Sequence, residues 1–81
     1  MFGKEVANLE LKNRRKLVKV SQLELAKQVN VTNDYISHLE RNKKTPSLTL
    51  AKNISDYLMK KAEENNLPKE LFTIDNIFFI K

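Results

Sequence analysis

Hydrophobic residues recur along the chain at the three- and four-residue spacing of amphipathic helices. This spacing predicts a first helix over about residues 4–18, a second over about 22–29 and a third over about 33–41. A fourth helix follows Pro46 and Ser47, which favour a helix start, and continues to about residue 64. Because the chain holds one Gly and two Pro and its apolar spacing is mostly helical, we expect an all-α domain.

The C-terminal segment, residues 69–81, is strongly apolar but too short for its periodicity to be decisive. It fits one or two short helical turns, and it also fits a terminal strand over residues 77–80. The sequence leaves both alternatives open. So many apolar residues in a small domain can exceed what one copy covers, and an interface with a second copy would bury the remainder.

Residues that favour helix ends support these boundaries. Ser21 and Glu24 form a capping-box pattern, in which the Ser21 oxygen accepts from the Glu24 N–H and the Glu24 carboxylate returns to the Ser21 N–H. Asn30 stands where a helix C-terminus favours a left-handed residue. Thr32 is suited to cap the third helix, so a short turn is expected between the second and third helices.

The two sides of the predicted helices differ in chemistry. The positions expected to face the core are Val6, Leu11, Val18, Leu25, Ala26, Val29, Ile36, Leu39, Leu48, Ala51, Ile54, Tyr57 and Leu58. The opposite side of the third helix presents Asn33, Asp34, Ser37, His38 and Arg41. These polar side chains vary in hydrogen-bonding type, which suits the edges of nucleic-acid bases better than a solvated face of Lys and Glu would.

Composition narrows the classes of protein that fit. At 81 residues there is room for one domain, and 41% hydrophobic with 31% charged residues is typical of a folded chain. Without Cys there is neither a disulfide nor a Cys-based zinc site, and the lone His38 has no acidic partners at ligand spacing. We therefore expect no metal and no cofactor. The sequence also contains neither a Cys nucleophile nor a Gly-rich phosphate loop, which argues against an enzyme.

Charge and hydropathy indicate the kind of partner. The formal net charge of +5 favours a polyanionic partner, although charge alone is weak evidence. No apolar stretch approaches the roughly 20 residues that cross a bilayer, so we expect no membrane association. The absence of Cys fits a reducing cytoplasm, which is the location that we expect.

Several short motifs occur together in the order that a known family shows. They are LKNRR at 11–15, Ser21-Gln22 with Leu25-Ala26, Val31-Thr32 with Tyr35-Ile36-Ser37, Leu39-Glu40-Arg41, and Pro46-Ser47-Leu48. Over residues 11–58 the chain resembles the helix-turn-helix domain of the phage-repressor/Cro (Xre) family. The resemblance implies a single domain over 1–81, a compact lambda-repressor-like bundle of about five helices. Its fourth helix is extended, and residues 59–81 form a C-terminal extension in which 73–78 correspond to the family's last short helix.

The resemblance assigns base contacts to the third helix. Thr32, Asn33, Asp34, Ser37 and His38 align with positions that meet base edges or their methyl groups. Their chemistry agrees, because Asn33 can bond adenine N6 and N7 together and His38 can donate to guanine. Asp34 either accepts from cytosine N4 or simply complements the helix dipole, and both interpretations remain open.

Other positions are expected to contact the DNA backbone or to hold the scaffold. By resemblance, Gln22 contacts a phosphate and supports the recognition helix, while Arg15 and Glu40 form a semi-buried ion pair between the first helix and the end of the third. The basic loop after the third helix is placed to contact phosphates. The expected phosphate contacts are Gln22, Arg41, Lys43 and Lys44, of which Arg41 fits plain solvent exposure equally well.

Three positions depart from the family, which usually has Gly where this chain has Lys19, Asn30 and Asn42. Asn tolerates a left-handed conformation, so the last two are mild changes. Lys19 is less usual. It indicates that the turn between the first two helices either differs from the family or carries strain.

Taken together, these residues favour a DNA-binding transcriptional regulator of the repressor type. The resemblance implies a homodimer, formed through the C-terminal region, that binds a palindromic operator with its recognition helices about one DNA turn apart. No small-molecule ligand is expected. The alternative is an adaptor or antitoxin-like protein with the same fold, whose apolar tail docks on another protein.

Overall fold

The computed structural model describes residues 3–41 and 43–78, with the side chains of residues 3–9 left out of the description. In this part of the chain the helices are α1 (Gly3–Leu17), α2 (Gln22–Gln28), α3 (Asn33–Glu40), α4 (Leu48–Glu64), the 3-10 helix η1 (Lys69–Phe72) and α5 (Ile74–Phe78). The predicted all-α class and the extended fourth helix are confirmed. The tail is helical through Phe78, so a strand beginning at Ile77 is wrong, and residues 79–80 lie outside the described part.

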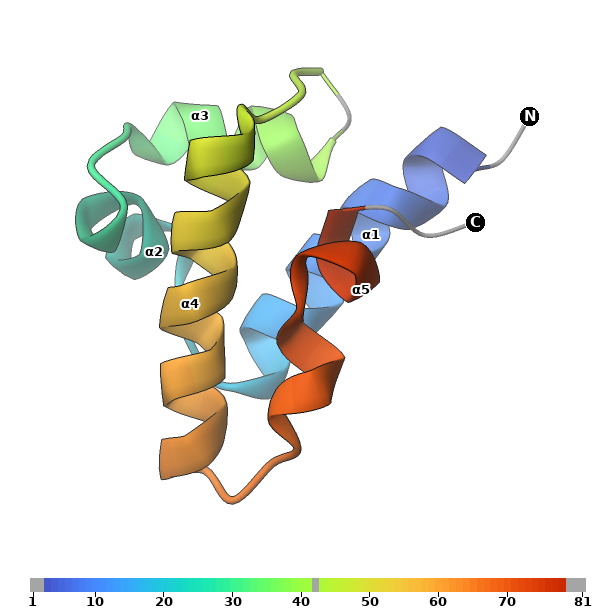
Figure 1. The fold of residues 1–81 in the computed structure, drawn as a ribbon. Helices are drawn as coiled ribbons and strands as arrows, with labels where there is room; N and C mark the ends of the chain where they lie inside the picture. Colours follow the sequence, from blue (N-terminus) through green and yellow to red (C-terminus); the bar gives the residue numbers. More distant parts are fainter. Residues whose placement is uncertain (1–2, 42, 79–81) are drawn as a thin grey trace.

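Helix α4 runs along the domain, with α2 and α3 beside its first half and α1 and α5 on its other side (Figure 1). The pair α2 and α3 packs together and meets α1 and α4, while η1 packs on α4 and α5 lies between α1 and α4. The C-terminal extension is therefore part of the bundle rather than an appendage.

A single hydrophobic core joins these helices. Its fully buried large side chains are Phe72, Leu11, Leu25, Ile36, Leu39, Ile54, Leu58 and Ile77. Two of them, Phe72 and Ile77, come from the C-terminal extension, which explains part of the apolar character of the tail. Most of the predicted core positions are buried, but Leu48 is 73% exposed and was wrongly placed there. As the first residue of α4, it precedes the turn at which that helix meets its neighbours.

Two other predicted core positions need comment. Tyr57 is half-buried, because its hydroxyl end reaches a polar group on α2. The side chain of Val6 lies outside the described residues.

Three helices end in the same left-handed turn. Lys19, Asn30 and Asn66 have φ of 61°, 62° and 59°. The residue after each donates its N–H back across the last helical turn, at 3.2 Å to the Arg15 carbonyl, 2.9 Å to the Ala26 carbonyl and 2.8 Å to the Ala62 carbonyl. These are Schellman motifs, which satisfy carbonyls left free at a helix end. The prediction for Asn30 is confirmed, whereas Asn42 lies outside the described residues.

The Lys19 turn has the same geometry as the other two. Lys19 therefore holds a side chain in the left-handed region, which costs conformational free energy that Gly would not, while the comparison with the family's turn stays a prediction.

The starts of α2, α3 and α4 are capped by hydroxyl groups. Ser21, Thr32 and Ser47 accept from the backbone N–H of Glu24, Tyr35 and Leu50, at 3.0, 3.0 and 3.1 Å. Half of the predicted capping box is wrong. The Glu24 carboxylate accepts instead from the Tyr57 hydroxyl and lies 3.7 Å from the Lys61 ammonium, so it joins α2 to α4 rather than closing on its own helix.

Candidate nucleic-acid interface

Helix α3 has a buried side and a solvent side. Ile36 and Leu39 are fully buried in the core, and Tyr35 is half-buried against it. These contacts place the opposite side of α3, about half a helical turn away, at the surface. The core therefore determines which side chains of α3 a partner can reach.

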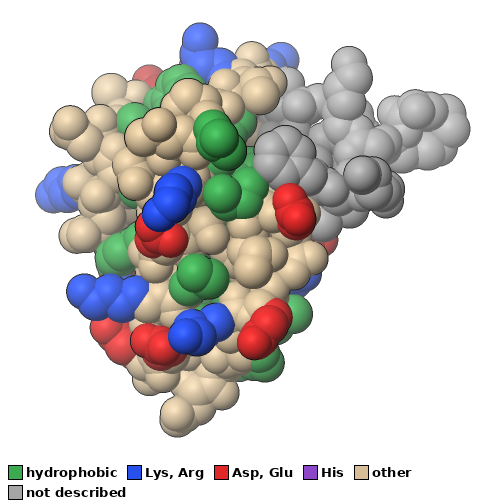
Figure 2. All heavy atoms as spheres, viewed as in Figure 1, with side chains coloured by type: hydrophobic (Ala, Val, Ile, Leu, Met, Phe, Trp, Pro, Cys, Tyr) green, Lys and Arg blue, Asp and Glu red, His purple; other side chains and the backbone are tan. Residues whose placement is uncertain are grey.

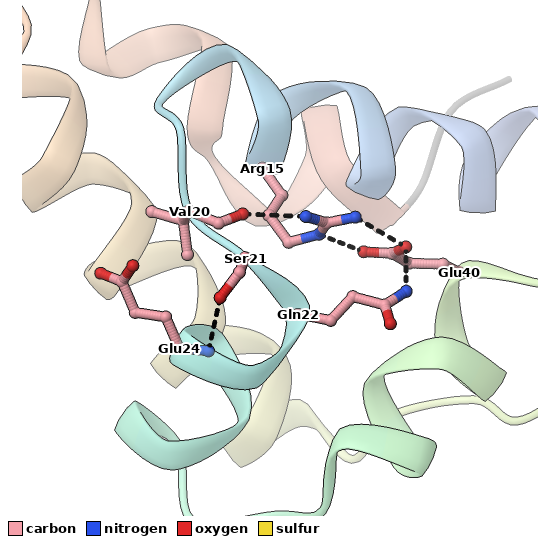
Figure 3. Close-up of polar contacts among 6 residues, drawn as sticks. All are labelled: Arg15, Val20, Ser21, Gln22, Glu24 and Glu40. Carbon is pink, nitrogen blue, oxygen red and sulfur yellow. Dashed lines mark hydrogen bonds and ion pairs between the residues drawn. The ribbon is translucent and has the colours of Figure 1, made fainter.

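The C-terminal end of α3 is held by a buried polar network (Figure 3). The Arg15 guanidinium of α1 donates to both carboxylate oxygens of Glu40, with Nε–Oε2 at 2.6 Å and Nη2–Oε1 at 3.2 Å. Its Nη1 donates to the Val20 carbonyl at 2.8 Å. The two charged side chains are only 7% and 3% exposed. Because every buried side-chain N and O atom among the described residues has a hydrogen-bond partner, the network tolerates little displacement of α3.

Gln22 belongs to the same network. Its Nε2 donates to Glu40 Oε1 at 2.9 Å, and its side chain is only half-buried. The first residue of α2 is thus joined to the last residue of α3. The amide nitrogen carries a second N–H, for which the described residues provide no acceptor.

The solvent side of α3 carries all five positions expected to read bases. Thr32, Asn33 and Asp34 are exposed, and Ser37 and His38 are partly exposed one turn later. The Thr32 hydroxyl is engaged as the helix cap. Within the described residues, the side chains of the other four make no hydrogen bond or ion pair, so their polar atoms are available to a partner.

A basic segment follows this face. Arg41 is the C-cap that follows α3, and Arg41, Lys43 and Lys44 are all exposed. The Lys43 N–H donates to the His38 carbonyl at 2.8 Å, which folds the start of the loop against the end of α3. Positive charge therefore continues directly from the polar face.

The face formed by α4 and α5 has a different charge pattern. Figure 2 shows acidic and basic side chains interspersed with hydrophobic ones on this side of the molecule. Lys52 pairs with Asp56 at 3.2 Å, Lys61 with Glu64 at 3.4 Å, and Lys69 Nζ lies 3.1 Å from Glu63 Oε2. Since these charges largely compensate one another, the α4–α5 face is a poorer site for a polyanion than the α3 side.

One side-chain contact that joins α2 to α4 could not be predicted from the sequence. The Tyr57 hydroxyl of α4 donates to Glu24 of α2, and the Lys61 ammonium lies 5.7 Å from the centre of the Tyr57 ring. Burial, followed by the hydrogen bond to the Glu24 carboxylate, raises the pKa of Tyr57 above its ordinary value. Because 33 residues separate the two partners, no local spacing predicts this contact.

The described part of the chain offers neither a metal site nor a membrane-spanning helix. No group of three His, Cys, Asp or Glu side chains there could hold a metal ion. Over residues 3–41 and 43–78, no helix is both long enough and apolar enough to span a membrane.

Comparison with known proteins assigns the family. The sequence model of a helix-turn-helix family (HTH_3) matches residues 11–65, which is about two thirds of the chain and covers α2, α3 and all of α4. Comparisons with curated proteins and with solved structures gave no significant match. The match contains the Arg15–Glu40 network, the polar face of α3 and the basic segment after it. The chain therefore belongs to the Xre/lambda-repressor-like helix-turn-helix family of DNA-binding transcription regulators.

Proposed function

We propose that this protein is a cytoplasmic repressor that binds double-stranded DNA sequence-specifically and reads the major groove with α3. The observation that carries the proposal is the solvent side of α3, where the side chains of Asn33, Asp34, Ser37 and His38 have no hydrogen-bond or ion-pair partner among the described residues. The helix that carries them is fixed by a buried ion pair. Sequence-specific recognition needs such unpaired groups on a rigid support, since their geometry must match one pattern of donors and acceptors on the base edges.

In this proposal each residue on the solvent side of α3 has its own role in recognising the bases. Asn33 recognises adenine through two hydrogen bonds, and His38 donates to guanine. Ser37 is permissive, and the Thr32 methyl group meets a thymine methyl while its hydroxyl caps the helix. Asp34 is exposed at the second position of α3, where it either accepts from cytosine or complements the helix dipole.

The DNA backbone is held by groups on both sides of α3. The free N–H of the Gln22 amide donates to one phosphate, while its other N–H keeps Gln22 against Glu40. Arg41, Lys43 and Lys44 contact phosphates beyond the C-terminal end of α3. These contacts position the reading face and supply most of the salt-dependent affinity.

The proposed repressor acts as a homodimer, formed through its C-terminal region, on a palindromic operator. Residues Leu71, Ile74 and Phe78 of that region are only partly buried, and Ile74 lines a shallow groove of about 370 Å³ together with Met59. A second copy would cover these apolar groups. Substituting Ile74 by Asp should then lower the sedimentation coefficient to that of a monomer without unfolding the protein, and an intact dimer would contradict this interface.

The experiment that tests the function is selection of binding sites from random duplex DNA, followed by affinity measurement on the recovered duplex and on the random pool. We expect recovery of a palindrome whose half-sites lie about one helical turn apart, bound at least 10³-fold more tightly than the pool. No enrichment, with equally weak binding to every duplex, would refute sequence-specific repression.

A further inference from the structure

Lys19 occupies a backbone conformation that is unfavourable for its side chain. It has φ of 61° in the turn between α1 and α2, and the Schellman hydrogen bonds on either side of it are both formed, at 3.0 and 3.2 Å. In the left-handed region the Cβ atom approaches the backbone too closely, a cost that Gly avoids and that Asn tolerates better than Lys does. Among the described residues with positive φ, the other two are Asn.

The Lys19 side chain makes no contact that offsets this cost. It is exposed, and it forms no hydrogen bond or ion pair with any described residue. Its interaction with the dipole of α1 is small, because the ammonium is exposed to solvent. The folded protein alone thus gives no account of a Lys at this position.

The turn that carries Lys19 is rigidly connected to the reading helix. The next residue, Val20, accepts a hydrogen bond from Arg15 Nη1 at 2.8 Å, and the same guanidinium binds Glu40 at the end of α3 (Figure 3). Gln22, three residues after Lys19, binds Glu40 as well. A group on this turn therefore keeps a fixed position relative to α3.

We propose that Lys19 is an additional DNA phosphate contact, made from the turn between α1 and α2. The inference rests on the proposed function and adds to it a basic group outside the α3 end and its loop. Its ammonium is exposed, has no partner among the described residues, and belongs to the residue three positions before Gln22, the proposed phosphate contact at the start of α2. The free-energy cost of the strained backbone at Lys19 is then offset by its contact with DNA in the complex, whereas nothing offsets it in the free protein.

The test separates the charge of Lys19 from its strain. Lys19→Gln removes the ammonium and keeps a side chain in the left-handed region, whereas Lys19→Gly removes both. Asn30→Gly is the matched control for relief of strain, and Lys60→Gln, at an exposed position of α4, is the control for loss of one positive charge. Affinity for the selected duplex and for the random duplex pool is measured across a salt titration, together with the melting temperature of each variant.

We expect both Lys19 variants to reduce the slope of log affinity against log salt by about 0.9, and to weaken binding by the same factor on both DNA probes. Lys19→Gly should also raise the melting temperature by roughly 4 °C, while Lys19→Gln should leave it close to that of the wild type. Both controls should retain the wild-type slope. A higher melting temperature together with weaker DNA binding in Lys19→Gly is a combination that a purely structural residue would not produce.

Two results would overturn the inference. One is a wild-type salt slope in Lys19→Gln, and the other is an equal loss of slope in Lys60→Gln, which would show a general effect of net charge. Failure of the proposed function looks different, since site selection with the wild-type protein would then enrich no duplex and binding would be equally weak on every duplex.

Discussion

Arg15 in α1 and Glu40 in α3 form a two-pronged ion pair in the protein interior, with Nε–Oε2 at 2.6 Å and Nη2–Oε1 at 3.2 Å. Taking two charges out of water costs nearly as much as their attraction returns, so such a pair contributes little net stability. It does select one arrangement of α1 and α3, because any displacement leaves a buried charge unpaired. We therefore infer that the pair fixes the orientation of α3, the helix proposed to read the DNA.

The first prediction is that losing one partner of this pair costs much more stability than the intact pair contributes. Glu40→Ala leaves the Arg15 guanidinium buried without its counter-charge and should lower the free energy of unfolding by about 3–5 kcal/mol, measured by urea denaturation. Asp56→Ala breaks an exposed pair with Lys52 and should change it by less than about 1 kcal/mol.

Replacing both charged partners should be milder than replacing one. Arg15→Met with Glu40→Met removes both desolvation costs, so this double variant should be more stable than Glu40→Ala while binding DNA less well than the wild type. A double variant less stable than Glu40→Ala would show that the pair itself supplies stability.

A second prediction concerns alkaline pH. The folded protein raises the pKa of Tyr57, first through burial and then through Glu24, and it raises the pKa of Lys61, first through its hydrogen bond to Glu64. The folded state thus keeps both protons at pH values where the unfolded chain has begun to lose them. The free energy of unfolding should fall as the pH rises above about 10, and this can be followed by urea denaturation at successive pH values.

Tyr57→Phe isolates the contribution of the phenol. The free energy of unfolding of this variant should be lower by about 1 kcal/mol at neutral pH, because the hydrogen bond to Glu24 is gone. It should also fall less steeply as the pH rises into the alkaline range. Tyr35→Phe is the matched control, since the Tyr35 hydroxyl makes no hydrogen bond within the described residues. An equal response of the two variants would mean that the Tyr57–Glu24 contact has no role in stability.

The third prediction addresses the C-terminal extension. Phe72 is fully buried, and its carbonyl accepts a hydrogen bond from the buried Ser55 hydroxyl at 2.7 Å. Phe72→Ala should lower the free energy of unfolding by about 3–5 kcal/mol, whereas Leu48→Ala, at an exposed position, should lower it by less than about 0.5 kcal/mol. Truncation after Leu67 removes Phe72 and Ile77 together and should unfold the domain, as seen by loss of the cooperative thermal transition. A truncated chain that still melts cooperatively would show that residues 1–67 fold alone.

Local patterns predicted the longer helices of this domain well, because the starts of α2, α3 and α4 and the ends of α1, α2 and α4 are each marked by a few neighbouring residues. Ser21, Thr32 and Ser47 are caps in both the sequence and the structure. The helical form of the tail was not predictable, since a few apolar residues have the same pattern in a buried helix and in a buried strand. Its conformation is determined by packing against α1 and α4.

The scaffold of the candidate site was predicted less evenly than the helices. The family motif brought Arg15 and Glu40 together across 25 positions, which no local spacing could do. By contrast, the prediction for Glu24 followed a local capping rule. In the structure its carboxylate accepts a hydrogen bond from the distant Tyr57 hydroxyl instead of from the backbone of its own helix. Contacts between distant polar side chains depend on the final packing of helices, so they are visible in the structure first.

The last prediction separates reading of bases from attachment to the backbone. Asn33 and Lys44 are both exposed and both uninvolved in contacts among the described residues, so neither substitution should shift the melting temperature appreciably. Asn33→Ala should remove about 1–3 kcal/mol of discrimination at one base pair and leave the salt dependence unchanged, because only a base contact is lost. Lys44→Gln should weaken binding equally on the selected duplex and on the random pool, and reduce the salt slope by about 0.9. Fluorescence anisotropy on both probes measures each quantity. If Asn33→Ala instead lowered affinity for both probes by the same factor, then α3 would contact the DNA backbone rather than the bases, and sequence would have to be read elsewhere on the protein.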